Sequence, residues 1–192
     1  MLFVFLAALT APAFAGNSCV NRDQNDPYND VYHSSVFLHG FRHGYEAGFY
    51  QADLELHLAH PLKDARQYQT FRDVPCKDDN RDRGLYDDGF RAGFVVGMQD
   101  MGANRDFRVL TLLAGARADL TPSAAMDHQF DYGVSQGYLV ASGGTRHLAS
   151  KMLSKCTTNA QSGFCAGVRT GRTLGNMTLS DGTKSAALHQ AP

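Results

Sequence analysis

Gly44-Tyr45-Glu46-Ala47-Gly48 says more about the architecture of this chain than any other five residues, because its pattern occurs three times. The other copies are Gly89-Phe90-Arg91-Ala92-Gly93 and Gly163-Phe164-Cys165-Ala166-Gly167. Each copy lies in a longer row of small residues at every fourth position: Gly40, Gly44, Gly48 and Ala52; Gly89, Gly93 and Gly97; Gly163, Gly167, Gly171 and Gly175. A degraded fourth copy is formed by Gly133, Gly137 and Ala141.

Residues four apart lie on one face of an α-helix, so each row predicts a helix with a groove free of side chains. Aromatic residues follow the glycines at fixed phase, as Phe41, Tyr45 and Phe49 do, and loops do not keep such a period. A glycine inside a helix costs about 1 kcal/mol relative to alanine. Dispersion and Cα–H···O contacts between touching backbones can offset that cost, so the rows predict close Gly-x3-Gly helix crossings.

No segment alternates in the manner of a strand, and we predict an all-α protein, a compact bundle of about six to seven helices. The predicted helices run from an Asp26-Pro27 cap to about His60, and over Leu62–Arg72, Asp82–Met101, Phe107–Ala118, Thr121–Ser142, His147–Lys155 and Ala160–Leu174. The uneven spacing of the copies indicates an internally repeated helix pair and not a solenoid.

The first 15 residues are apolar and end in Ala13-Phe14-Ala15, the pattern of a secretory signal peptide cleaved before Gly16. An uncleaved membrane anchor is the alternative. We therefore expect a secreted or periplasmic protein with one helical domain over residues 16–175 and a loose tail over 176–192.

Charge excludes some classes of partner. Eighteen Lys and Arg residues nearly balance 19 Asp and Glu residues, and no basic patch stands out, which argues against nucleic acid as a partner. The glycine-rich segments contain charged residues such as Arg42, Glu46 and Arg91, so we expect no transmembrane segment in the mature chain.

Four cysteines in an exported chain predict two disulfides, for which three pairings exist. We favour Cys156–Cys165, which closes a short helix-turn-helix, and Cys19–Cys76, which ties the N-terminal segment to an inter-helix loop. Free buried thiols are the alternative.

His39 and His43 are one helical turn apart, a spacing that can hold zinc or copper, and Glu46 on the next turn can supply a third ligand. The competing interpretation is a metal-free helix on which His43 and Glu46 form an exposed pair. A metal-binding protein is therefore one alternative function.

Gly133-Val134-Ser135-Gln136-Gly137 matches the glycine-x-serine-x-glycine elbow of hydrolases, which requires a buried strand before the serine. A small secreted hydrolase using Ser135 is the second alternative. The tyrosines at positions 45, 50, 86, 132 and 138 either pack in the core or form a surface on which a ligand stacks.

The glycine-aromatic phrasing resembles the repeats of poorly characterised secreted bacterial helical proteins, and its spacing is similar to the deca-glycine-x3 motif of helical adaptor proteins. The resemblance implies local helix geometry and no functional residue. Because the residues complete no catalytic constellation, we predict a non-enzymatic domain without a cofactor that binds another protein or an envelope component.

Overall fold

The computed structural model describes residues 35–74, 83–118, 129–143 and 162–188, together with Ser154 and Cys156. Over these residues all regular structure is helical, as predicted. The elements are α3 (Val36–His57), the short 3-10 helix η1 (Ala65–Gln67), α4 (Gln69–Arg72), α5 (Arg83–Gly102), α6 (Val109–Ala116), α8 (Phe130–Ala141) and α10 (Gly163–Leu188).

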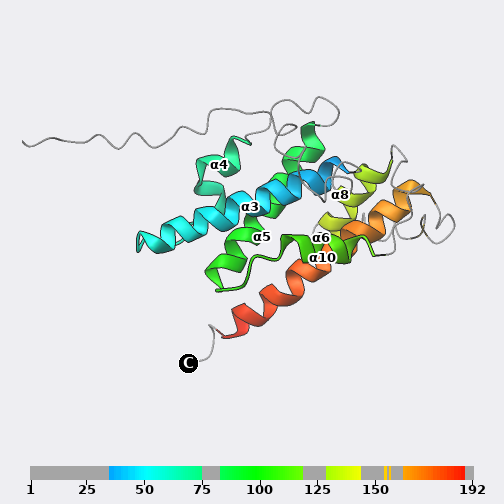
Figure 1. Cartoon of the computed structure of the whole chain (residues 1–192). Coiled ribbons are helices and arrows are strands. Elements are labelled where there is room, and N and C mark those ends of the chain that lie inside the picture. Colours follow the sequence, from blue (N-terminus) through cyan, green and yellow to red (C-terminus); the bar gives the residue numbers. More distant parts are fainter. Residues whose placement is uncertain are drawn as a thin grey trace, which may run out of the picture.

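Two helix pairs form the body of the bundle. In Figure 1, α3 runs beside α5 and α8 runs beside α10, and α6 joins the pairs by packing on both α10 and α3. A single cluster of buried apolar side chains extends across both pairs. It includes Phe37, Phe41, Tyr45, Leu112, Leu113, Phe130, Val134 and Leu174.

The backbones of α3 and α5 touch along their glycines. A β-carbon added to Gly40, Gly44 or Gly48 would overlap the carbonyl oxygen of Tyr86, Phe90 or Phe94, respectively. The contact is reciprocal, since β-carbons on Gly89, Gly93 and Gly97 would overlap the carbonyl oxygens of Phe37, Phe41 and Tyr45. Each glycine therefore lies over a carbonyl three residues before a glycine of the other helix.

The same arrangement of contacts recurs between α8 and α10. A β-carbon on Gly133 or Gly137 would overlap the carbonyl oxygen of Phe164 or Val168, and one on Gly167 or Gly171 would overlap that of Phe130 or Val134. Gly133 thus occupies in the second pair the place of Gly44 in the first, and Gly167 that of Gly93, since Phe164 and Phe90 hold the same position in the repeated Gly-Phe-x-Ala-Gly sequence.

The start of α3 differs from the prediction. Ser35 has extended backbone, with φ −146° and ψ 116°, and its Oγ accepts a 3.2 Å hydrogen bond from Leu38 N–H as the N-cap. A helix running unbroken from Asp26 and Pro27 is therefore wrong. The predicted helix over Leu62–Arg72 is also interrupted, because residues 61–64 are irregular before η1 and α4.

The end of α10 also differs. A loose tail from Asn176 was expected, together with a helix end near Leu174, yet α10 continues to Leu188. Met177 packs against the core, and Thr178 is buried with its Oγ donating a 2.8 Å hydrogen bond to the Gly175 carbonyl. Packing of Met177 on the core and burial of Thr178 stabilise the helix just past Asn176, where the sequence has no apolar period.

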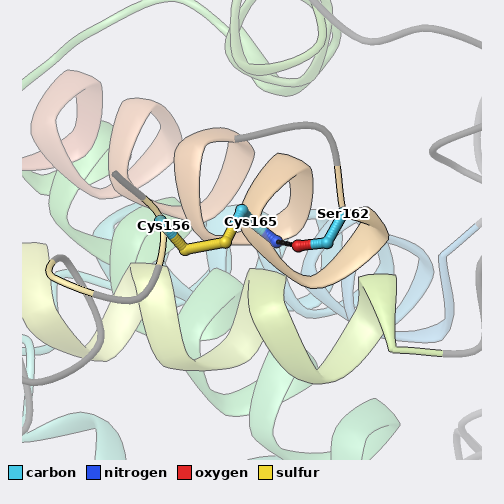
Figure 2. Close-up of a disulfide and its surroundings, with 3 residues drawn as sticks. All are labelled: Cys156, Ser162 and Cys165. Carbon is cyan, nitrogen blue, oxygen red and sulfur yellow. Dashed lines mark hydrogen bonds between the residues drawn. A yellow bond between two sulfur atoms is a disulfide. The ribbon is translucent and has the colours of Figure 1, made fainter. Parts of the chain in front are cut away.

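The Cys156–Cys165 disulfide is present, as predicted, with 5.3 Å between the Cα atoms. Figure 2 shows it beside the first turn of α10, where Ser162 Oγ accepts a 3.2 Å hydrogen bond from Cys165 N–H. Several predictions lie outside the described residues: the signal peptide over 1–15, the cleavage before Gly16, the Cys19–Cys76 pairing and, apart from Ser154, the helix over 147–155.

Candidate functional site

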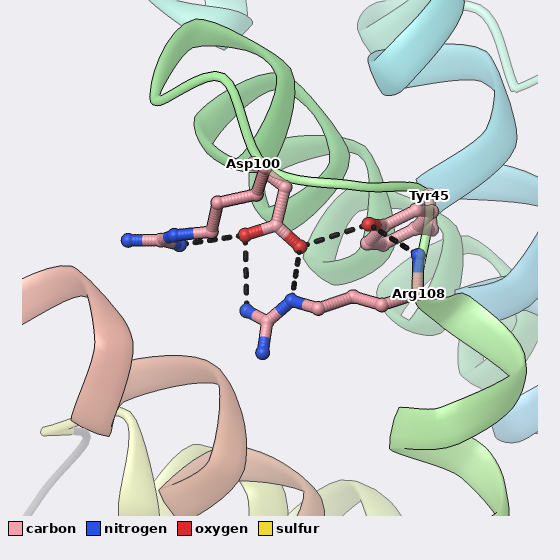
Figure 3. Close-up of polar contacts among 4 residues, drawn as sticks. Tyr45, Asp100 and Arg108 are labelled. Atoms are coloured by element: carbon pink, nitrogen blue, oxygen red, sulfur yellow. Dashed lines mark hydrogen bonds and ion pairs between the residues drawn. The ribbon is translucent and has the colours of Figure 1, made fainter.

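A buried carboxylate joins α3, α5 and the segment before α6. Asp100, on the last turns of α5, has no exposed surface and accepts a 2.8 Å hydrogen bond from the Tyr45 hydroxyl of α3. Arg108 Nε and Nη2 bind its two oxygens at 2.8 and 3.0 Å, and Arg105 Nη1 donates at 2.7 Å. The Arg108 backbone N–H donates in turn to the Tyr45 hydroxyl at 3.2 Å, as Figure 3 shows.

This network fixes the protonation of its members. Burial alone raises the pKa of Asp100, but hydrogen bonds from Arg108, Arg105 and Tyr45 outweigh it and hold the pKa below its ordinary value. Burial raises the pKa of Tyr45, and the neighbouring Asp100 adds to the increase while the Arg108 N–H opposes it. At neutral pH Asp100 is therefore an anion and Tyr45 is a neutral hydrogen-bond donor. Both groups act in this network as structural residues.

The network positions an exposed ring. Phe107 lies between the two anchored arginines in sequence, and its ring centroid is 5.4 Å from that of Tyr45 and 5.3 Å from that of Phe49. It also stacks with Tyr50, at 6.1 Å and an interplanar angle of 26°. A loop residue is thus held in one place by an ion pair at each side and by three aromatic neighbours.

An apolar strip extends from this ring along α3. Tyr50, Leu54 and Leu58 are one helical turn apart and therefore lie on one side of the helix. Their exposed fractions are 62% for Tyr50, 54% for Leu54, 55% for Leu58 and 42% for the adjoining Phe107. We call these four residues the α3 strip.

The histidines predicted as metal ligands do lie together, without the predicted carboxylate. His39 is buried, and its ring centroid is 4.5 Å from that of His43. Glu46 instead pairs with Arg42, whose Nε donates at 3.0 Å, because Arg42 lies one turn before it. The third group at the histidines is Tyr86 of α5, whose hydroxyl is 2.9 Å from His43 Nδ1.

His57 and His60, at the end of α3, each face a carboxylate. His57 Nδ1 is 3.1 Å from Asp53, which raises the pKa of this histidine through the Asp53 carbonyl and carboxylate, and His60 Nδ1 is 3.1 Å from Glu55. Across the part of the chain that the structure describes, no three His, Cys, Asp or Glu side chains converge in a way that can hold a metal ion.

Ser135 lies inside α8 and is buried, with helix on both sides of it in place of the strand that a nucleophile elbow requires. The tyrosines divide into two groups. Tyr45, Tyr86 and Tyr138 are buried, whereas Tyr50 and Tyr132 are exposed.

Sequence reasoning missed Asp100, Arg105, Arg108 and Phe107. The available signal was a carboxylate three residues after Gly97, on the face that the glycines bury, followed by two arginines. A charge at such a position requires partners, and the arginines were the nearest cations in the sequence.

The chain matches no protein-family model, and neither the curated proteins nor the solved structures gave a match. The resemblance to secreted glycine-aromatic repeat proteins therefore stays a prediction. Of the helices in the described ranges, none combines the length and the apolar composition that a membrane crossing needs.

Proposed function

We propose that this protein is a non-enzymatic, secreted or periplasmic helical domain that binds another protein or an envelope component through the α3 strip. The observation that carries the proposal is the exposure of Tyr50 and Phe107 as a stacked pair that the Asp100 network holds in place. Exposed aromatic residues on a rigid support are typical anchors of protein interfaces, because little side-chain entropy is lost when they are covered.

The rest of the molecule supports a scaffold role. We infer that the α3·α5 and α8·α10 pairs are two copies of one glycine-packed unit, since the glycine-to-carbonyl contacts are the same in both. Such close backbone contact leaves little freedom for the helices to shift. The disulfide supports residence in an oxidising compartment, where such bonds persist.

The test replaces Tyr50 with the photo-crosslinking residue p-benzoylphenylalanine in the organism that makes the protein, and replaces Tyr132 in a control. Tyr132 is a suitable control because it is an exposed tyrosine of similar accessibility on α8. We expect a discrete adduct from position 50 and none from position 132. Adding Leu54→Ser and Leu58→Ser should remove the adduct, because both side chains lie in the α3 strip and are more than half exposed.

Equal adducts from both positions would contradict the proposal, as would the absence of any adduct at position 50. An adduct with the mass of two copies of this chain would show that the α3 strip binds a second copy of the chain and not another protein or envelope component.

A further inference from the structure

We propose that His39 and His43 of α3 and Tyr86 of α5 form a binding site for one copper(II) ion. This site is independent of the α3 strip. It uses the two histidines that the sequence singled out and replaces the predicted Glu46 by a tyrosine from the neighbouring helix.

The distances among the three side chains suit one ion. Two ligand atoms that are each about 2.0 Å from an ion, at right angles around it, lie about 2.8 Å apart. His43 Nδ1 and the Tyr86 hydroxyl oxygen are separated by 2.9 Å. Two imidazoles in the same relation have ring centres about 4.5 Å apart, and the centroids of His39 and His43 are 4.5 Å apart. The ring of Tyr86 completes the triangle at 5.6 Å from His39 and 6.2 Å from His43.

The ligand types favour copper(II). Two imidazole nitrogens and one phenolate oxygen form a mixed N,O set of the kind that copper(II) binds in tetragonal geometry, and divalent copper has the highest affinity of the first-row ions for such sites. Binding replaces the hydrogen bond between His43 and Tyr86 with two metal–ligand bonds, and the phenol proton leaves to solvent. A water molecule can take the fourth position on the side of His43, which is only half-buried.

The experiment titrates the folded, disulfide-intact protein with copper(II) and records visible absorbance and electron paramagnetic resonance. We expect one equivalent to bind, with imidazole nitrogen hyperfine structure and a phenolate-to-copper charge-transfer band. Tyr86→Phe should remove the charge-transfer band while the imidazole signal remains. His39→Tyr and His43→Gln should each weaken binding by more than about tenfold.

Far-UV circular dichroism checks that the three variants fold. His57→Gln with His60→Gln is the matched control and should leave affinity and spectrum unchanged. The proposal is overturned if the wild-type chain binds no copper, or if zinc is bound at least as tightly as copper. It is also overturned if a variant that combines Tyr86→Phe, His39→Tyr and His43→Gln binds copper with the affinity and spectrum of the wild type.

Discussion

Gly44 of α3 and Phe90 of α5 are in direct backbone contact. A β-carbon built on Gly44 would overlap the Phe90 carbonyl oxygen and lie 2.6 Å from the carbonyl carbon. Neither of these atoms can rotate away as a side chain does, so the helices themselves would have to separate. The absence of a side chain at position 44 is therefore a condition for this pairing.

We predict that Gly44→Ala lowers the free energy of unfolding by about 3 kcal/mol, because overpacking against backbone outweighs the gain of about 1 kcal/mol in helix propensity. Urea denaturation measures the change. Gly84→Ala is the matched control, since it lies in α5 with nothing within 4 Å of the added carbon. It should raise stability by up to about 1 kcal/mol, and a Gly44→Ala variant that behaves like it would contradict the close contact.

Helix periodicity predicted the glycine-rich helices well because it is local information. The predicted bounds of the second glycine helix, Asp82–Met101, differ by one residue at each end from the observed Arg83–Gly102. The ends of the other two long helices were missed for reasons outside the glycine pattern. Ser35 caps α3 well after the predicted start at Asp26 and Pro27. α10 continues past Asn176, where Met177 packs on the core and Thr178 is buried.

The buried carboxylate predicts a specific pH dependence. Because the pKa of Asp100 is lower in the folded than in the unfolded chain, its contribution to stability is complete above the unfolded pKa of about 3.9 and is lost as pH falls through the folded pKa. We expect Asp100→Asn to cost about 3 kcal/mol at neutral pH, since two arginines lose their charged partner.

Stability measured between pH 6 and about pH 2 in both proteins tests this. The wild type should lose more stability than Asp100→Asn below about pH 4, so that the difference between them narrows. Burial raises the pKa of Asp88, so this carboxyl contributes to the pH dependence of stability with the opposite sign. Both proteins contain Asp88, and its contribution therefore cancels in the difference between them. A difference that stays constant down to the lowest pH would contradict the charged network.

The candidate sites show where sequence reasoning stops. The four-residue spacing along α3 correctly predicted that His39 and His43 lie together. Arg42 is also four residues before Glu46, and these two side chains form an ion pair. Tyr86 and Asp100 come to their partners across α3 and α5, so no pattern within one helix could assign them. The reciprocal glycine contacts set that register, and they are visible only once the pairing of the helices is known.

Removal of the Cys156–Cys165 disulfide should lower the free energy of unfolding moderately. The two cysteines are nine residues apart, and closing a loop of that length stabilises by about 2.5 kcal/mol in the chain-entropy description. We expect Cys156→Ala with Cys165→Ala to reduce the free energy of unfolding by about that amount. Ser162→Ala separates the cap from the bond, because it removes only the hydrogen bond to Cys165 N–H and should cost about 1 kcal/mol. A loss in the double cysteine variant no larger than that in Ser162→Ala would contradict the chain-entropy value.

The turn of α10 that follows Asn176 should contribute to stability, although the sequence predicts a loose tail there. Met177 packs on the core and lies against α6, where its Cε would be 2.7 Å from a β-carbon added to Gly115. We predict that Met177→Ala costs about 2 kcal/mol, because it removes a side chain that fills the space between α10 and α6. Leu179→Ala, two residues later at a side chain that is 41% exposed, should lower the free energy of unfolding by less than Met177→Ala does. Thermal or urea unfolding of both variants measures the change. If Met177→Ala lowers the free energy of unfolding no more than Leu179→Ala does, the core ends before Asn176, as the sequence alone predicts.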